Sequence, residues 1–150
     1  MKRALALVVA VEDYATASGL ACLERTVSHA YEFVEWLLNV RRADPGDVFL
    51  CTTPEPAQLA SEIQAGVHTF SATRASIRSA VVELVSRGAD AGGDVFVYVS
   101  GHGGRFDGSD VLMASDYQSH DGENCIRLTA RAETQGIAAS DCTALIRERK

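Results

Sequence analysis

One histidine at the end of an apolar run is the residue of this sequence best suited to chemistry. The segment 94–104 reads DVFVYVSGHGG, so His102 stands between small residues directly after a run of valines and aromatics. Small neighbours leave an imidazole uncovered and let a substrate backbone approach closely. Imidazole titrates near neutral pH, which suits it for general acid–base catalysis. A glycine-rich turn that carries a surface histidine is the alternative interpretation of the same residues.

Four cysteines are the thiols that could act with this histidine. Cys22, Cys51, Cys125 and Cys142 form no C-x-x-C pair and show no regular spacing. A zinc site is therefore not expected, and a chain of this length has no need of a disulfide framework. We expect reduced thiols in a cytoplasmic protein, and the residue types alone do not say which thiol is a nucleophile.

Length, composition and charge predict a single globular domain with a real core. The chain has 150 residues, 47% of them hydrophobic, and a net charge of −6 without a stripe of lysine or arginine. This balance argues against a nucleic-acid partner. The apolar run 4–11 is short and meets Glu12 and Asp13, so we interpret it as a core strand and not as a signal peptide. No segment is long enough to cross a membrane.

Strand-like and helix-like segments alternate along the first hundred residues. Strands are expected at 5–11, 48–51 and 95–99, and helices at 27–38 and 77–85. Thr73 is a candidate N-cap of the second helix, and Gly88 a candidate C-cap. This alternation predicts a parallel sheet with covering helices. The run 95–99 is expected to be buried on both faces, with the glycine loop after it at the ligand-binding edge.

The other segments carry weaker signals. Residues 52–70 contain two prolines and are interpreted as a surface excursion with a weakly helical part. The run 111–114 fits a fourth strand or a hairpin arm, Ile126 and Leu128 are the last clear core positions, and the tail could be helical. His29 is expected on a helix surface, and His68 and His120 in polar loops.

Several segments together resemble the caspase-like cysteine peptidases, in particular bacterial caspase homologues and metacaspases. The residues that carry the resemblance lie between 5 and 128 and comprise the opening VVAVEDY (8–14), the run 71–81, GDVFVYVSGHG (93–103), and Asp107-Gly with Leu112 and Asp116. The resemblance implies an α/β fold, a caspase-like three-layer sandwich with a mostly parallel central sheet and helices on both faces. It also implies peptide-bond hydrolysis by a cysteine–histidine dyad, with no metal or organic cofactor.

The resemblance assigns roles to particular residues. His102 matches the histidine that shuttles a proton between the cysteine and the leaving amine, and the N–H of Gly103 matches the oxyanion-hole donor. Glu24 and Arg25 lie in the stretch that selects the substrate side chain: a carboxylate would favour Arg or Lys, a guanidinium Asp. Asp116 matches a position near the substrate loops, where a structural role fits equally well.

The nucleophile is the point at which the resemblance fails. In the family it stands in Asp-x-Cys after a buried strand, with a glycine following. Cys142 is the candidate by distance from His102, but Asp141 is directly adjacent to it and no glycine follows. We therefore expect 1–150 to be a caspase-like domain incomplete at its C-terminal side, with the nucleophile outside this chain. A second chain or a C-terminal segment would then cover an exposed sheet edge and complete the active site.

Two alternatives come from other functional classes. A catalytically dead caspase-like interaction module would keep the fold without the cysteine, although such a module has no need of an uncovered His102. An unrelated flavodoxin-like domain would bind phosphate after its first strand. There this chain has Glu12 and Asp13, which repel phosphate.

Overall fold

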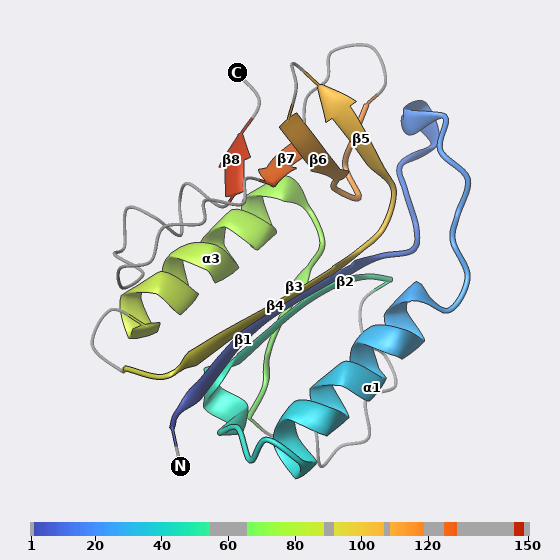
Figure 1. The fold of residues 1–150 in the computed structure, drawn as a ribbon. Coiled ribbons are helices and arrows are strands. Elements are labelled where there is room, and N and C mark those ends of the chain that lie inside the picture. Colours follow the sequence, from blue (N-terminus) through green and yellow to red (C-terminus); the bar gives the residue numbers. More distant parts are fainter. Residues whose placement is uncertain are drawn as a thin grey trace.

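In the described part of the chain, a parallel sheet with a helix on each face forms the centre, and a small antiparallel sheet extends it (Figure 1). The computed structural model describes residues 2–54, 66–88, 92–106, 109–118, 125–128 and 146–148. The strands are β1 (Ala4–Val11), β2 (Val48–Thr53), β3 (His68–Ser71), β4 (Asp94–Ser100), β5 (Gly103–Phe106), β6 (Ser109–Met113), β7 (Cys125–Leu128) and β8 (Ile146–Glu148). The helices are η1 (Thr16–Ser18), α1 (Thr26–Asn39), η2 (Pro45–Asp47) and α3 (Arg74–Gly88).

The large sheet has the order β3-β2-β1-β4, with every pair parallel. All eight residues of the central strand β1 are buried. Leu5, Leu7 and Val9 pack with α3, whereas the small side chains of Ala6 and Ala10 pack with α1 on the other face. Alternation of side chains across a strand produces these two cores. The expected parallel sheet with helices on both faces is thereby confirmed.

The second sheet has the order β5-β6-β7-β8 and is antiparallel throughout. β5 and β6 form a hairpin, so the run 111–114 is the hairpin arm that the sequence left open. Gly103 and Gly104 belong to β5, which reduces the expected glycine loop to two residues between β4 and β5. Ile126 is 1% exposed and Cys125 is buried beside it, as expected of packing residues.

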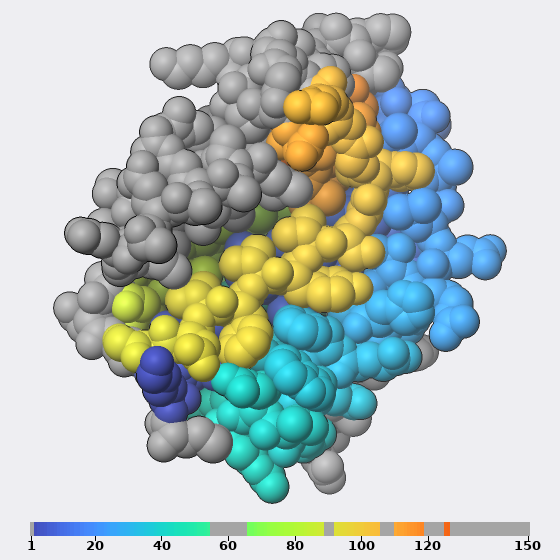
Figure 2. Space-filling view, in the orientation of Figure 1, coloured from blue at the N-terminus to red at the C-terminus, as the bar shows by residue number. Residues whose placement is uncertain are grey.

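The expectation that β4 is buried on both faces is wrong. Its residues are mostly half-exposed, and Val97 is 50% exposed. β4 is an end strand of the large sheet among the described strands, and Figure 2 shows it in yellow on the surface beside α1. An apolar run indicates a strand, but it does not show whether that strand has a neighbouring strand at both edges. The sequence therefore did not predict the exposure of β4.

Two further expectations need correction. Within the expected surface excursion 52–70, residues 52–53 belong to β2 and residues 68–70 to β3. The His68 ring stacks on Phe49 with centroids 5.0 Å apart instead of lying in a polar loop. The tail, for which the sequence allows a helix, contains strand β8. The weakly helical part of 52–70, the pair Asp107-Gly108 of the family resemblance, His120 and Cys142 lie outside the described residues.

The helices agree with the sequence analysis. α3 begins after Thr73, whose hydroxyl oxygen accepts the Ser76 N–H at 3.2 Å, and it ends at Gly88. His29 lies exposed on α1. Within the described part of the chain, neither helix has the length and apolarity required to span a membrane.

Candidate active site

His102 lies in the two-residue link between β4 and β5, at the carboxyl end of the parallel sheet. Gly101, which precedes it, has φ +157°, and a Cβ there would lie 2.8 Å from the Tyr14 hydroxyl oxygen. A side chain at this position would be strained and would collide with its neighbour. Glycine is therefore required at position 101 for the chain to turn tightly from β4 into His102.

Both backbone groups of His102 are hydrogen-bonded to other parts of the fold. Its N–H donates to the hydroxyl oxygen of Tyr14 at 2.6 Å, and its carbonyl accepts the N–H of Met113 at 3.0 Å. Tyr14 belongs to the loop after β1, and Met113 ends β6. The backbone from which the imidazole extends is thus held from two sides.

The imidazole is oriented by a main-chain carbonyl. Nε2 of His102 lies 2.8 Å from the carbonyl oxygen of Ala21. A carbonyl can only accept, so Nε2 carries a proton and Nδ1 of the neutral ring has a free lone pair. The ring also meets that of Tyr14, with centroids 5.0 Å apart at an angle of 55°. This arrangement leaves Nδ1 as the atom able to take up a proton.

The register of the hairpin gives the direction of the Gly103 amide. Met113 donates to His102, so these two residues form a hydrogen-bonded pair, and the next pair, Gly103 with Leu112, is a non-hydrogen-bonded one. The N–H of Gly103 therefore turns away from β6. β5 is an end strand of its sheet in the described part of the chain, so this N–H faces the sheet edge beside His102.

Asp116 has a structural partner in the fold. Its Oδ1 accepts the N–H of Arg74, the first residue of α3, at 3.0 Å. The adjacent Ser115 accepts the Ala15 N–H and donates to the Ala72 carbonyl, both at 2.9 Å. This segment therefore ties the loop after β1 to the start of α3. The contact between Asp116 and the substrate stays a prediction.

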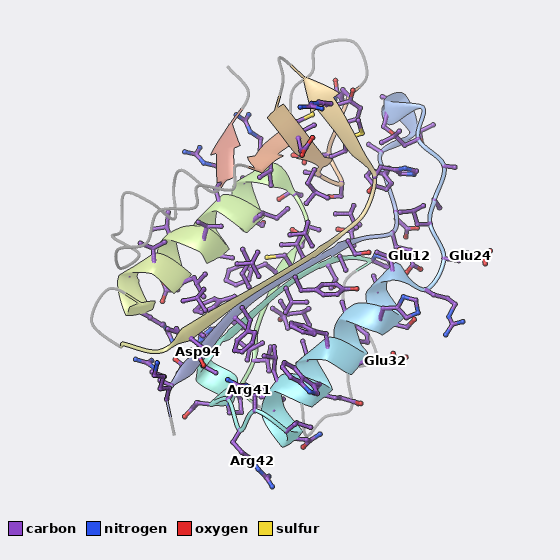
Figure 3. The ribbon with its side chains drawn as sticks, viewed as in Figure 1. Glu12, Glu24, Glu32, Arg41, Arg42 and Asp94 are labelled. Atoms are coloured by element: carbon purple, nitrogen blue, oxygen red, sulfur yellow. The ribbon has the colours of Figure 1, made fainter. Side chains whose placement is uncertain are left out.

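Glu24 and Arg25 are exposed immediately before α1, and Arg25 has a left-handed backbone with φ +66°. Figure 3 shows Glu12 and Glu24 near the N-terminal end of α1 and Glu32 further along the helix. Glu12 has a capping role that the sequence did not indicate, because its Oε2 accepts the Val27 N–H at 3.0 Å. The segment that carries Glu24 and Arg25 is continuous with Ala21, so the two charges are close in the chain to the contact that orients His102.

The cysteines differ sharply in environment. Cys51 is fully buried, and burial raises the pKa of its thiol to about 12. Cys125 is 1% exposed, whereas Cys22 is exposed. Neither buried thiol can act as a nucleophile. Cys142 lies outside the described residues. Among the residues that are described, no group of His, Cys, Asp and Glu side chains could hold a metal ion.

The residues that position His102 carry little sequence signal. Tyr14 stands in the opening segment that resembles the caspase-like peptidases, but nothing there shows its contact with position 102. The contribution of Ala21 is a backbone carbonyl, which every residue has.

Comparison with known proteins agrees with this geometry. No curated protein matches the chain. A family model described as the caspase domain matches residues 3–150. Cysteine peptidase activity is characteristic of that family, and its mixed α/β fold agrees with the parallel sheet and flanking helices found here. The chain belongs to the caspase-domain family.

Proposed function

We propose that this chain supplies the general acid–base half of a cysteine endopeptidase active site. His102 is the acid and base, and the N–H of Gly103 is an oxyanion-hole donor. The nucleophilic cysteine comes from sequence outside the described residues, either beyond this chain or at Cys142. The observation that carries the proposal is the hydrogen bond of 2.8 Å between Nε2 of His102 and the carbonyl oxygen of Ala21. It leaves Nδ1 of His102 able to accept a proton.

The proposed reaction gives His102 and Gly103 the following roles. Nδ1 of His102 takes the thiol proton, and the thiolate attacks the carbonyl carbon of the substrate. The oxygen of the tetrahedral intermediate gains negative charge, which the Gly103 N–H stabilises. The C–N bond then breaks, and His102 returns its proton to the leaving amine. Water, deprotonated by His102, hydrolyses the remaining thioester and regenerates the thiol.

The Ala21 carbonyl contributes to the step in which His102 becomes charged. It accepts the Nε2 proton both before and after Nδ1 is protonated, so the tautomer and the ring orientation are preserved. A carboxylate does the same for the imidazole of serine hydrolases. Here the acceptor is neutral, so it orients the ring without adding a full negative charge to the site.

The edge of β4 supports a partner that completes the sheet. Val97 is 50% exposed, and the strand carries unpaired edge groups in the described part of the chain. Edges of this kind pair readily with another strand. We place on this edge a second chain or a C-terminal segment that brings the nucleophile beside His102. Cys22 and Cys51 are reduced thiols, which supports the proposal of a cytoplasmic protein related to bacterial caspase homologues and metacaspases.

Covalent trapping of the full-length protein tests this function. Peptides that end in an electrophilic ketone after Arg or after Asp are incubated with the wild type and with H102A, and the modified cysteine is identified by mass spectrometry. We expect one cysteine to react with one of the two peptides, at least 100-fold more slowly in H102A. Preference for Arg assigns specificity to Glu24, and preference for Asp assigns it to Arg25.

Cys22 provides the control, because it is exposed and reacts with any small alkylating agent. Its labelling by iodoacetamide should be the same in H102A as in the wild type. If the peptide ketones modify no cysteine of the folded protein, the acid–base role of His102 is wrong, and an inactive interaction module explains the fold. Modification of Cys142 would place the nucleophile within this chain.

A further inference from the structure

Tyr14 joins the end of the central strand to the candidate catalytic histidine. Its hydroxyl oxygen accepts the His102 N–H at 2.6 Å and lies 3.4 Å from the carbonyl oxygen of Val11, to which it can donate. A phenol has one proton to donate, and this geometry directs it to Val11. The hydroxyl thus connects a buried residue of β1 directly to the backbone of position 102.

The surroundings leave this hydroxyl little freedom. A Cβ on Gly101 would lie 2.8 Å from it, 3.2 Å from Leu112 and 3.3 Å from Val11, so the space between the phenol and the link after β4 has no room for a side chain. Burial raises the pKa of Tyr14, and the hydrogen bond from His102 lowers it by a smaller amount. The phenol therefore keeps its proton at neutral pH and can serve as donor and acceptor together.

Tyr14 and Ala21 belong to the same loop, which runs from the end of β1 to the start of α1. One holds the backbone of His102 and the other holds its Nε2. The loop is itself fixed, because the Leu23 N–H donates to the Glu12 carbonyl at 2.9 Å and the Ala15 N–H to the Ser115 carbonyl at 2.9 Å. Because this fixed loop binds His102 at two points, it determines the position of the backbone that carries the imidazole and the orientation of the ring.

We propose that Tyr14 is a positioning residue for His102. Its hydroxyl fixes the backbone at position 102 so that Nε2 stays on Ala21 and Nδ1 remains the proton-accepting atom. The catalytic part of this inference rests on the proposed function, whereas the positioning itself depends only on the contacts described above. Without the hydroxyl, the amide of His102 loses its acceptor, and the bonds to Met113 and Ala21 remain.

The test uses Y14F, which keeps the aromatic ring and removes only the hydroxyl. Y31F is the matched control, because Tyr31 is also a half-buried tyrosine, and it packs on the α1 face of the sheet, away from His102. Nitrogen-15 NMR of the imidazole reports the tautomer, and hydrogen exchange reports the His102 amide. In Y14F we expect exchange at least 10-fold faster and a mixture of the two tautomers, with Y31F like the wild type.

Kinetics of the full-length enzyme separate this inference from the proposed function. Y14F should lower kcat on the order of 10-fold with KM unchanged, because a positioning residue acts on His102 and not on substrate binding. A folded Y14F protein with wild-type tautomer and wild-type amide exchange would overturn the positioning role. If the NMR changes occur but the wild type neither cleaves peptides nor reacts with peptide ketones, the proposed function fails and the positioning role stands.

Discussion

At the scale of single residues, the groups that contact His102 in the described part of the chain are all uncharged. A tyrosine hydroxyl, a carbonyl and a backbone amide contact it, and each fixes a different atom. Neutral hydrogen-bond partners fix the orientation of the imidazole without keeping the ring permanently in its charged form. This arrangement suits a group that must gain and lose a proton in each catalytic cycle.

Replacing His102 by Gln separates its shape from its acid–base chemistry. The Gln amide can still donate to the Ala21 carbonyl, but it has no group that titrates. We expect H102Q to unfold at the same urea concentration as the wild type and to lose about 10²–10⁴-fold in kcat/KM for peptide cleavage. Activity within 10-fold of the wild type would show that His102 is not the acid–base group.

Gly101 offers a residue-scale prediction about stability. G101A places a methyl group 2.8 Å from the Tyr14 oxygen at φ +157°, so it adds a collision to backbone strain. G19A is the control, because Gly19 has φ +69° and nothing within 4 Å of the added Cβ. We expect G19A to cost about 1 kcal/mol of unfolding free energy and G101A about 3 kcal/mol in urea titrations. Equal costs would mean that the contact with Tyr14 adds nothing.

At the scale of elements, the sequence predicts those whose signal is local. β1, β2, α1 and α3 follow from apolar periodicity and from the cap at Thr73, and each lies close to its expected bounds. Four-residue β3 and three-residue β8 are too short to show a periodicity. Their strand structure comes from pairing with β2 and β7, which are distant in the sequence.

The residues of the candidate site also differ in whether the local sequence predicts their role. Position 102 stands out because its small neighbours follow a strand, and the resemblance to a family adds the role of Gly103. The supports at Tyr14 and Ala21 depend on where a loop from the other end of the sheet comes to lie. A contact made through a backbone carbonyl leaves no constraint on residue type, so the sequence of this chain does not record it.

Asp116 allows a test between structural and substrate-binding roles at the start of α3. Its carboxylate accepts the Arg74 N–H and lies at the positive end of the helix dipole. We expect D116A to lower the unfolding free energy by about 1 kcal/mol, and D116N, which keeps an acceptor oxygen, by less. The measurement is chemical denaturation together with KM. A raised KM at unchanged stability would favour the substrate-binding role instead.

At the scale of the whole molecule, the two edges of the large sheet differ. β3 is short and polar, whereas β4 is longer and apolar, with Val97 exposed between the packed side chains of Val95 and Val99. Natural edge strands are usually protected by charge. An apolar edge beside His102 therefore fits a molecule whose sheet continues into a further segment.

A lysine on this edge tests that continuation. V97K should weaken pairing at β4, while V82K, also at an exposed valine but on the outer face of α3, should not. In the full-length protein, we expect the β4 amides of V97K to exchange at least 10-fold faster than those of V82K and the wild type. Identical exchange in all three proteins would mean that no strand pairs with this edge.

The pH dependence of stability follows from the buried thiol of Cys51. Burial raises its pKa from 9.0 to about 12 in the folded protein, so the native state keeps a proton that the unfolded chain releases. The stabilisation is complete below pH 9 and is lost progressively as pH rises towards 12. Tyr14 and Tyr31, whose pKa values are also raised by burial, act in the same direction.

C51A isolates the contribution of this thiol. The variant loses some stability at pH 7 through the small cavity, by about 1–2 kcal/mol, but it has no proton to release. The difference in unfolding free energy between wild type and C51A should therefore shrink as pH rises from 9 to 11, measured by urea denaturation at each pH. A constant difference over this range would show that the Cys51 thiol ionises in the folded protein as readily as in the unfolded chain.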